Sequence, residues 1–290
     1  MAALTPGFAY WLADVAAWLA WRYRHGHRRA VRRNLLPALD GDRDATRDAS
    51  LEVFKNVGRY YVDMATMKYR DLDELNTQEL EIVGEERLDQ LRAADRAMIV
   101  SAHIGNPEVA VQALSRRGRD FAALVEPLAE RAYAQVLLDI RASGGGHYYE
   151  ATISGARAAL RDLRAGTVLC TLGDRDLHGT GVCIQFMDRF VRVPRGPWQI
   201  ARREGALVFP MFAERVGRRG TRVTIEEPFL VPRGGELEHD ICRAATRWAK
   251  LLEDAIRRAP GQWTVMEDFW RVYRCCPDHA TQPAPHARST

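Results

Sequence analysis

The chain has 290 residues, of which 47% are hydrophobic and 28% charged, and its formal net charge is +4 at pH 7. These values are typical of a globular protein with a large core, and they exclude a collagen, a coiled coil and a disordered chain. The five cysteines are odd in number and none has C-x-x-C spacing. We therefore expect neither a disulfide framework nor a zinc site, and we expect a reducing, cytoplasmic location without a signal peptide.

An apolar stretch at residues 8–21 is followed by a basic cluster. The stretch is shorter than the ~20 residues of a membrane-spanning helix, and it contains Asp14. Its larger side chains repeat at helical spacing: Phe8, Trp11, Leu12, Val15, Trp18 and Leu19. Tryptophans beside arginines are typical of a helix that lies in the membrane interface. The alternative is an ordinary helix packed on the core.

The basic cluster holds six arginines, two histidines and no acid between Arg22 and Arg33. Such a cluster suits phosphate, in lipid headgroups or in nucleic acid, and a solvated helix face is the plain alternative. Together with the apolar stretch it favours membrane lipids and anionic headgroups as partners, and we expect no nucleic acid. We predict that residues 1–94 form a helical region with a membrane-associating segment.

From about residue 95, short apolar runs alternate with helical patterns. This alternation predicts an α/β protein with a mixed, largely parallel central sheet flanked by helices. We assign the α/β core to residues 95–272 and a disordered tail to residues 273–290. The predicted strands are 98–102, 121–125, 167–172 and 206–212, with hairpins at 181–194 and 215–228.

An ionisable pair, His103 and Glu108, follows the first of these strands. Asn106 and Pro107 predict the N-cap and first position of a helix, whose first turn would favour an ionised Glu108. A carboxylate beside an imidazole fixes its tautomer and stabilises the imidazolium, as a general base requires. The alternative is a purely structural role, with a hydrogen-bonded histidine at a strand end and a glutamate in a helix cap.

Two other readings of this stretch are weaker. A metal site would need a third ligand from Asp174, Asp176 or His178, and the His-x-x-x-x-Glu spacing does not place two ligands on one helical face. A serine hydrolase lacks the G-x-S-x-G pattern. We therefore expect no metal.

The triplet Asp174, Arg175 and Asp176 follows another predicted strand, and so we expect it at the same sheet edge as His103. A solvated turn with local ion pairs is the alternative. Further on, Arg195 precedes a helix that Pro197 would open. These arginines suit phosphate or a developing oxyanion, although a plain surface charge explains Arg195 as well.

Several motifs in a fixed order carry a resemblance to a known family. HIGNPE is followed by LGDRDL, then G-V-x-x-x-F, P-x-G-P, G-A-L-V-x-P and a terminal Q-W-x-x-x-x-x-F-W, and RRAVRRNL precedes them all. Over residues 28–270 the chain resembles the bacterial superfamily of late lipid A acyltransferases and phosphatidylinositol mannoside acyltransferases. That superfamily transfers a fatty acyl group from a thioester to a sugar hydroxyl of a membrane glycolipid.

The resemblance implies a role for several residues. His103 matches the family's base and Glu108 its acidic partner, while Asp174 and Arg175 match an Asp-Arg or Asp-Gln pair at the second strand end. Arg141 matches an arginine after the third helix. We assign these last three, with Asp176 and Arg195, to substrate binding or to stabilising the oxyanion.

The resemblance also implies the partners of the reaction. The donor would be acyl-CoA or acyl carrier protein, with no further cofactor, and the enzyme would sit peripherally on the cytoplasmic face of the cell inner membrane. The alternatives are a glycerophospholipid or lysophospholipid acyltransferase, whose usual pattern ends in aspartate, and a non-catalytic membrane-binding protein.

Overall fold

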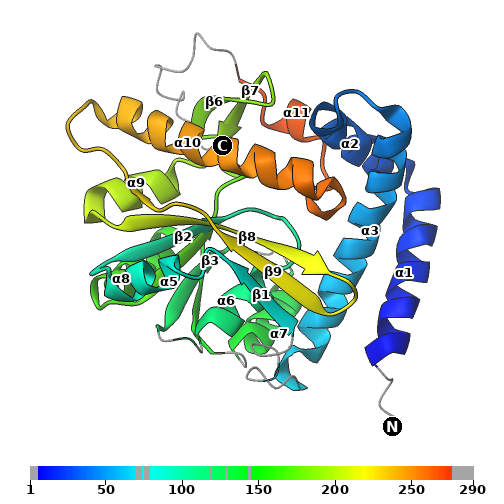
Figure 1. Ribbon diagram of the computed structural model, residues 1–290, viewed down its shortest axis with the longest axis horizontal. Helices are drawn as coiled ribbons and strands as arrows, with labels where there is room; N and C mark the ends of the chain where they lie inside the picture. The colour runs from blue at the N-terminus through cyan, green and yellow to red at the C-terminus, as the bar shows by residue number, and fades with distance from the viewer. Residues whose placement is uncertain are drawn as a thin grey trace.

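The computed structural model describes residues 6–69, 74, 79–115, 117, 119–127, 130–142 and 145–275. Figure 1 shows an α/β protein in which helices cover a twisted central sheet. The strands of this sheet are β1 (Leu80–Val83), β2 (Ala97–Ser101), β3 (Phe121–Val125), β4 (His147–Glu150), β5 (Val168–Leu172), β8 (Leu207–Val216), β9 (Gly220–Ile225) and β10 (Phe229–Leu230). Within the described residues their order is β1-β9-β8-β2-β5-β3-β4, with β10 paired to β8.

The sheet is mixed and largely parallel, which confirms the predicted fold class. β2 pairs in parallel with both β5 and β8, β5 with β3, and β3 with β4. β9 and β10 run antiparallel to β8, and the first of these pairings is the predicted 215–228 hairpin. The region up to residue 94, predicted as helical, also contains the strand β1, which pairs in parallel with β9.

Helices cover both faces of the sheet. They are α5 (Arg87–Ala93), α6 (Pro107–Ser115), α7 (Arg131–Ala142), α8 (Ile153–Arg164), α9 (Gly196–Glu204) and α10 (Leu237–Arg258). Successive side chains of a strand point to opposite faces. Met98 and Val100 of β2 therefore join the core beneath α8, α9 and α10, while Ala97 and Ile99 join the core beneath α5 and α6. Burial on both faces explains why β2 is apolar throughout.

A two-stranded hairpin lies outside the sheet. β6 (Val182–Phe186) pairs antiparallel with β7 (Arg189–Val193). Met187 and Asp188 form the predicted turn, both with positive φ, as a tight hairpin requires. A disulfide joins Cys183 to Cys275, so the expectation of no disulfide is wrong for this pair. The spacing of 92 residues carries no local sequence signal.

The end of the described chain packs on this hairpin. A short turn, η4 (Pro260–Gln262), and α11 (Phe269–Val272) precede a β-bridge between Arg274 and Val191 of β7. Tyr273 is buried. Residues 276–290 of the predicted disordered tail lie outside the described residues.

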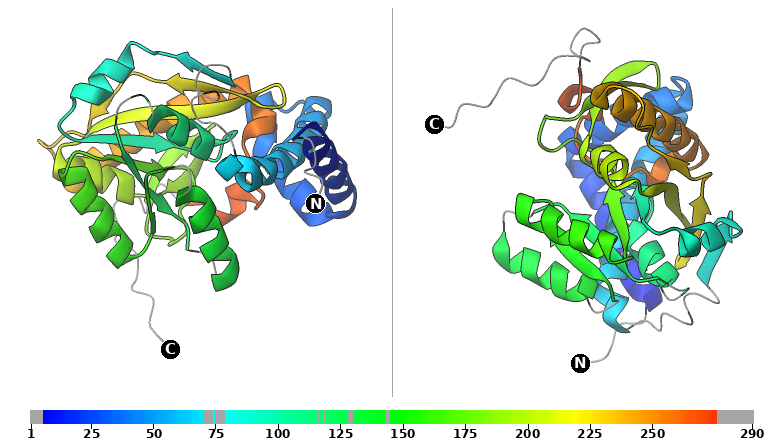
Figure 2. Two further views of the ribbon diagram at one scale, coloured as in Figure 1. Left: turned by 90° about the horizontal axis from the view of Figure 1, so that it is seen from below. Right: turned by 90° about the vertical axis from the view of Figure 1, so that its left-hand side faces the viewer.

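The N-terminal helices stand beside one end of the sheet in Figure 1 and in the left view of Figure 2. They are α1 (Pro6–Tyr23), α2 (His25–Leu35), η1 (Leu36–Leu39), α3 (Arg43–Thr66) and η2 (Met67–Tyr69). α1 packs on α3 through buried Tyr10 and Ala17, and Asp14 accepts two hydrogen bonds from Arg59 of α3, at 2.8 and 2.9 Å.

The opposite face of α1 is uncovered. The six apolar residues of the predicted stripe, which we call the α1 stripe, are each 36–52% exposed: Phe8, Trp11, Leu12, Val15, Trp18 and Leu19. α1 therefore packs on the core as the alternative expects, but through another face, and the α1 stripe stays exposed. Among the described helices, none combines the length and hydropathy needed to cross a membrane.

Candidate active site

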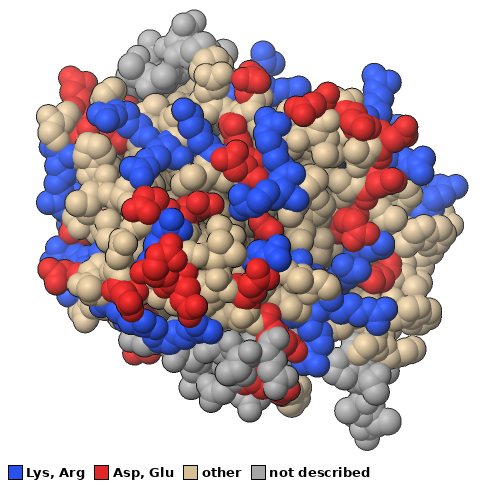
Figure 3. Space-filling view, in the orientation of Figure 1, with Lys and Arg blue, Asp and Glu red and all other residues tan. Residues whose placement is uncertain are grey.

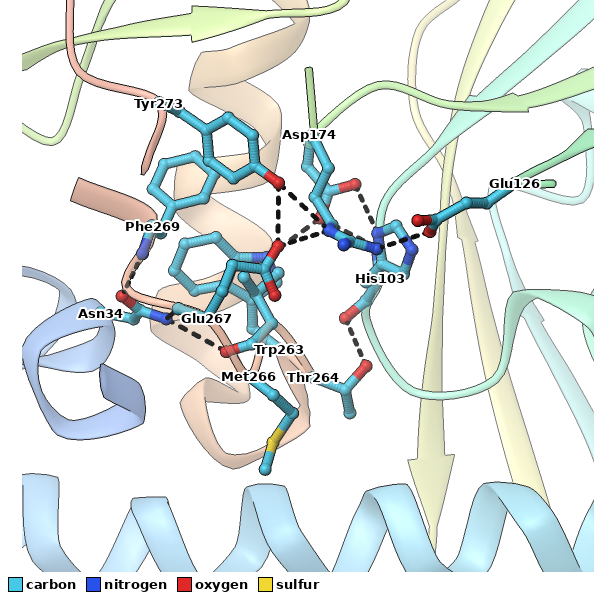
Figure 4. A network of polar contacts seen from close by, with 12 residues as sticks. Asn34, His103, Glu126, Asp174, Trp263, Thr264, Met266, Glu267, Phe269 and Tyr273 are labelled. Atoms are coloured by element: carbon cyan, nitrogen blue, oxygen red, sulfur yellow. Dashed lines mark hydrogen bonds and ion pairs between the residues drawn. The ribbon is translucent and has the colours of Figure 1, made fainter. Parts of the chain in front are cut away.

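His103 and Asp174 meet because β2 and β5 are neighbouring parallel strands. Ser101 pairs with Leu172 at the carboxyl ends of these strands, so the residues that follow emerge at the same sheet edge. Nδ1 of His103 lies 2.8 Å from Oδ1 of Asp174, and the backbone N–H of His103 donates to Oδ2 at 3.1 Å. The indole N–H of Trp263 donates to the same oxygen at 3.1 Å (Figure 4).

This environment keeps Asp174 ionised. The carboxyl group is fully buried, and burial alone would raise its pKa. The charge of His103 and the hydrogen bonds from His103 and Trp263 outweigh burial and hold the pKa of Asp174 below its ordinary value. The Nδ1–H of His103 then donates to this carboxylate, which leaves Nε2 as the basic nitrogen. His103 lines a cavity of about 720 Å³.

The backbone around His103 is held on both sides. Its carbonyl accepts hydrogen bonds from the backbone N–H of Thr264, at 2.7 Å, and from the Thr264 hydroxyl, at 3.0 Å. Gly105 donates its N–H to the carbonyl of Gln262 at 2.9 Å. Gly105 has φ +58°, and a Cβ there would lie 1.8 Å from the carbonyl oxygen of Ala213. Only glycine fits this turn, which fixes the direction in which His103 points.

Glu108 has a different partner from the one predicted. Oε1 of Glu108 accepts hydrogen bonds from Nε and Nη2 of Arg141 of α7, at 2.9 and 2.5 Å. Burial would lower the pKa of Arg141, but the charge of Glu108 and its hydrogen bonds raise it above the ordinary value. The sequence prediction paired His103 with Glu108, whereas among the described contacts the hydrogen-bonded acid of His103 is Asp174. Both His103 and Glu108 still line the same cavity.

The helix that carries Glu108 begins as predicted. Asn106 caps α6, because its Oδ1 accepts the N–H of Val109 at 3.2 Å, and Pro107 is the first helical residue. The amide of Asn106 donates to Asp63 of α3 at 2.8 Å. This buried contact ties the loop after His103 to the N-terminal helices.

Arg175 is held by acids from two other elements. Its Nε donates to Glu267 at 2.5 Å and its Nη1 to Glu126, which follows β3, at 3.0 Å. Nε also lies 3.3 Å from the hydroxyl of Tyr273. Burial would lower the pKa of Arg175, but the charge of Glu267 raises it. The guanidinium reaches the cavity wall as a positive charge that is already paired.

The other two predicted site residues also reach the cavity wall. Asp176 is buried and accepts the N–H of Gly181 at 2.8 Å, so it shapes the loop before β6. Arg195 donates to Glu238 at 2.6 Å. Within the described residues, no three His, Cys, Asp or Glu side chains gather so that they could hold a metal ion.

A segment near the end of the chain supplies contacts that the sequence reasoning did not assign. Trp263, Thr264 and Glu267 touch Asp174, His103 and Arg175 respectively (Figure 4). The segment is anchored by buried Asn34 of α2, whose amide donates to the carbonyls of Val265 and Glu267. The available signal was the terminal Q-W-x-x-x-x-x-F-W motif, which contains Trp263, and the RRNL stretch, which contains Asn34.

The chain is similar to proteins of one family along nearly all of its described length. The family described as "Bacterial lipid A biosynthesis acyltransferase" matches residues 1–272. A phosphatidylinositol mannoside acyltransferase of Mycobacterium tuberculosis (strain CDC 1551 / Oshkosh) is 29% identical over 260 residues, which cover 85% of this chain and 78% of the relative. A phosphatidylinositol mannoside acyltransferase of Mycolicibacterium smegmatis is 26% identical over 258 residues, with 85% and 81% covered.

Proposed function

Because the chain belongs to the bacterial lipid A biosynthesis acyltransferase family, and is therefore an O-acyltransferase, we propose that it acylates a hydroxyl of a membrane glycolipid. The donor in this proposal is acyl-CoA or acyl carrier protein. The names of the mycobacterial relatives favour an acceptor of the phosphatidylinositol mannoside type over one of the lipid A type. The observation that carries the proposal is His103, bonded to buried Asp174, at the wall of a large cavity.

In the proposed reaction, Nε2 of His103 takes the proton of the acceptor hydroxyl. The hydroxyl oxygen attacks the thioester carbon and forms a tetrahedral oxyanion. The oxyanion then collapses, the carbon–sulfur bond breaks, and the leaving thiolate takes the proton from the imidazolium. Asp174 stabilises that imidazolium, which is the role first predicted for Glu108. No covalent acyl-enzyme is needed, because the base activates the acceptor directly.

The oxyanion requires hydrogen-bond donors in the same cavity. The backbone N–H of Gly105 lies near His103 but already donates to the carbonyl of Gln262. Arg141, Arg175 and the backbone N–H of Asn106 remain the candidates. We assign Arg141 to this role, because Glu108 holds its guanidinium in place and both residues line the cavity with His103.

We further propose that the α1 stripe lies in the membrane interface on the cytoplasmic face. The stripe is apolar and exposed, and in Figure 3 the right-hand margin, where α1 lies, is largely uncharged. The arginines of α2 follow directly, where they would meet anionic headgroups. The helix α3, on which α1 packs, contributes Val57, Tyr60 and Tyr61 to the cavity wall. A single helix therefore separates α1 from the site.

The test of the reaction uses the full chain, an acyl-CoA and vesicles that contain phosphatidylinositol mannosides. Transfer is followed as thiol release and as acylated lipid by mass spectrometry. We expect His103→Ala to lower both by about 10²–10⁴-fold, with an unchanged circular dichroism spectrum. Near wild-type transfer by folded His103→Ala would rule out this base.

The membrane proposal has its own test. We expect a variant with Trp11→Glu and Trp18→Glu to sediment less with anionic vesicles than the unchanged chain. Both side chains point away from α3, so the fold should persist. Equal sedimentation of the two proteins would contradict the placement of the α1 stripe.

A further inference from the structure

Three side chains separate the main cavity from a second, smaller one. Ile99 of β2, Val111 of α6 and Phe121 of β3 line both the cavity of about 720 Å³ and a neighbouring cavity of about 20 Å³. Beyond these residues the small cavity is lined by apolar and basic side chains together with one serine: Leu88, Leu91, Arg92, Ser115, Arg117, Arg119 and Val168. The three side chains therefore form a partition, which we call the end wall, between two spaces on the same face of the sheet.

The end wall lies far from the chemistry along the strand direction. Phe121 pairs with Val168, and the register of β5 with β2 places Val168 level with Ala97. Ala97 lies six residues before His103, which corresponds to about 20 Å along a strand. A single acyl chain of a bilayer, whose hydrocarbon core is ~30 Å thick for two leaflets, spans about 15 Å. The end wall thus lies about 13 Å from His103 at Ile99, four residues before it, and about 20 Å at Phe121. These two distances bracket the length of one membrane acyl chain.

The cavity floor between His103 and the end wall is made of apolar or small side chains. Because side chains alternate along each strand, those that share a face recur at every second position. Ser101, Leu172, Cys170 and Ala123 line the cavity on the way to Phe121. An extended apolar chain with its carbonyl carbon beside His103 would lie along this row with its methyl end against the end wall.

Phe121 is fixed in its position. Its ring meets the ring of Tyr148 edge to face, with centroids 5.6 Å apart. Gly146 passes so close that a Cβ there would lie 2.4 Å from the Phe121 ring. Phe121 is 2% exposed. A side chain enclosed in this way cannot swing aside without moving its neighbours, so it presents a rigid surface.

We propose that the end wall formed by Phe121, Ile99 and Val111 sets the length of acyl chain that the enzyme transfers. The inference rests on the proposed function, because it needs the acyl chain to enter with its carbonyl at His103. Acyl chains that just reach the end wall gain binding free energy from each buried methylene. Longer acyl chains must displace the side chains of the wall.

The test uses one variant that removes part of the end wall and one that enlarges it. Phe121→Ala joins the two cavities, and Val111→Phe fills the space in front of the wall. The full-length proteins are assayed with equimolar mixtures of saturated acyl-CoAs that differ by two carbons, and the acylated lipids are quantified by mass spectrometry. We expect Phe121→Ala to favour longer chains and Val111→Phe shorter ones, by about fourfold per methylene gained or lost.

Phe209→Ala is the matched control. Phe209 of β8 is buried in the same hydrophobic core on the same face of the sheet, but it lines neither of the two cavities described. We expect it to lower the melting temperature, as Phe121→Ala does, and to leave the distribution of chain lengths unchanged. If Phe121→Ala does not fold, the test rests on Val111→Phe and Ile99→Phe, which we expect to shift transfer toward shorter acyl chains.

The outcomes separate the two proposals. An unchanged distribution of chain lengths in folded wall variants that still transfer acyl groups overturns the end wall and leaves the proposed function intact. Absence of acyl transfer in the unchanged chain, or transfer that does not depend on His103, overturns the proposed function and the end wall with it.

Discussion

Two charged pairs at one edge of the sheet contrast in what their geometry permits. His103 pairs with Asp174, which lies 71 residues away, and Glu108 pairs with Arg141, 33 residues away. The His103 side chain is 29% exposed over a fully buried acid, whereas Glu108 and Arg141 are both largely buried, at 16% and 12%. The first pair can take up a proton from a ligand, and the second holds a fixed charge. Two residues of one short motif therefore have separate tasks.

The sharpest way to break this comparison is Asp174→Asn. The asparagine keeps the shape but no longer stabilises the imidazolium or selects its tautomer, so we expect the turnover rate to fall by about 10³–10⁴-fold. Thiol release from acyl-CoA in the presence of glycolipid vesicles measures it. A loss of less than tenfold in a folded variant would show that Asp174 is not the acid that supports His103.

Compared with Asp174→Asn, Glu108→Gln should lower the turnover rate less and the free energy of unfolding more. The amide leaves Arg141 as a buried charge without its counter-ion, and breaking a buried ion pair costs about 3–5 kcal/mol of the free energy of unfolding. Urea denaturation measures that cost. The variant with both Glu108→Gln and Arg141→Gln removes the unpaired charge and should recover part of it. A turnover rate as low as that of Asp174→Asn, at unchanged stability, would instead restore Glu108 as the acid that supports the base.

Asn34 offers a test of the segment that holds the first pair. Its amide donates to the carbonyls of Val265 and Glu267, at 3.0 and 2.7 Å, and its oxygen accepts the N–H of Phe269 at 2.9 Å. In Asn34→Asp the two N–H donors are lost, and a negatively charged carboxylate faces the two backbone carbonyls. We expect a loss of about 2–6 kcal/mol in the free energy of unfolding and a lower turnover rate.

Asn56→Asp is the matched control for Asn34→Asp. Among the described residues, the amide of Asn56 makes a single hydrogen bond, at 2.9 Å, to the carbonyl of Gly261, which precedes the segment that Asn34 holds. If Asn34 positions the site, its variant should lower turnover more than Asn56→Asp does in assays at a temperature where both are folded. Equal turnover in the two variants would assign Asn34 a purely structural role.

The smallest expected effect concerns acid stability. The pKa of Asp174 is lower in the fold than its value of ~3.9 in an unfolded chain. The ionised carboxylate therefore stabilises the fold above that pH, and the contribution is lost as pH falls through the lower folded value. We expect Asp174→Asn to show a shallower loss of melting temperature on acidification. Parallel curves for the two proteins would contradict a lowered pKa.

The sequence predicted the positions of the buried strands better than the positions of the edge strands. The apolar runs at 98–102, 121–125, 167–172 and 206–212 correspond to β2, β3, β5 and β8. β4 was missed because an edge strand that pairs only with β3, among the described strands, can keep a polar sequence. β1 lies in the same position at the other edge.

The partner of His103 could not be read from spacing. Chain order places β3 after β2, but β5 inserts between them in the sheet, and that insertion brings Asp174 rather than a nearer acid to His103. The expectation that Asp174 shares the sheet edge of His103 is confirmed, whereas the acid paired with His103 in the sequence prediction was Glu108, which is near it in sequence. Trp263 and Asn34 act through contacts across 89 and more than 200 residues, for which periodicity gives no signal.

The segment that fixes the base also determines when the enzyme becomes complete during synthesis. β2 and β5 leave the ribosome long before Trp263 and Thr264, and chains fold from the N-terminus as they emerge. Before residues 263 and 264 emerge, Asp174 lacks the indole N–H of Trp263, and the backbone of His103 lacks its contacts with Thr264. Because these contacts span 89 and 161 residues, the geometry around His103 forms only when the core from β2 to residue 264 has folded as a unit.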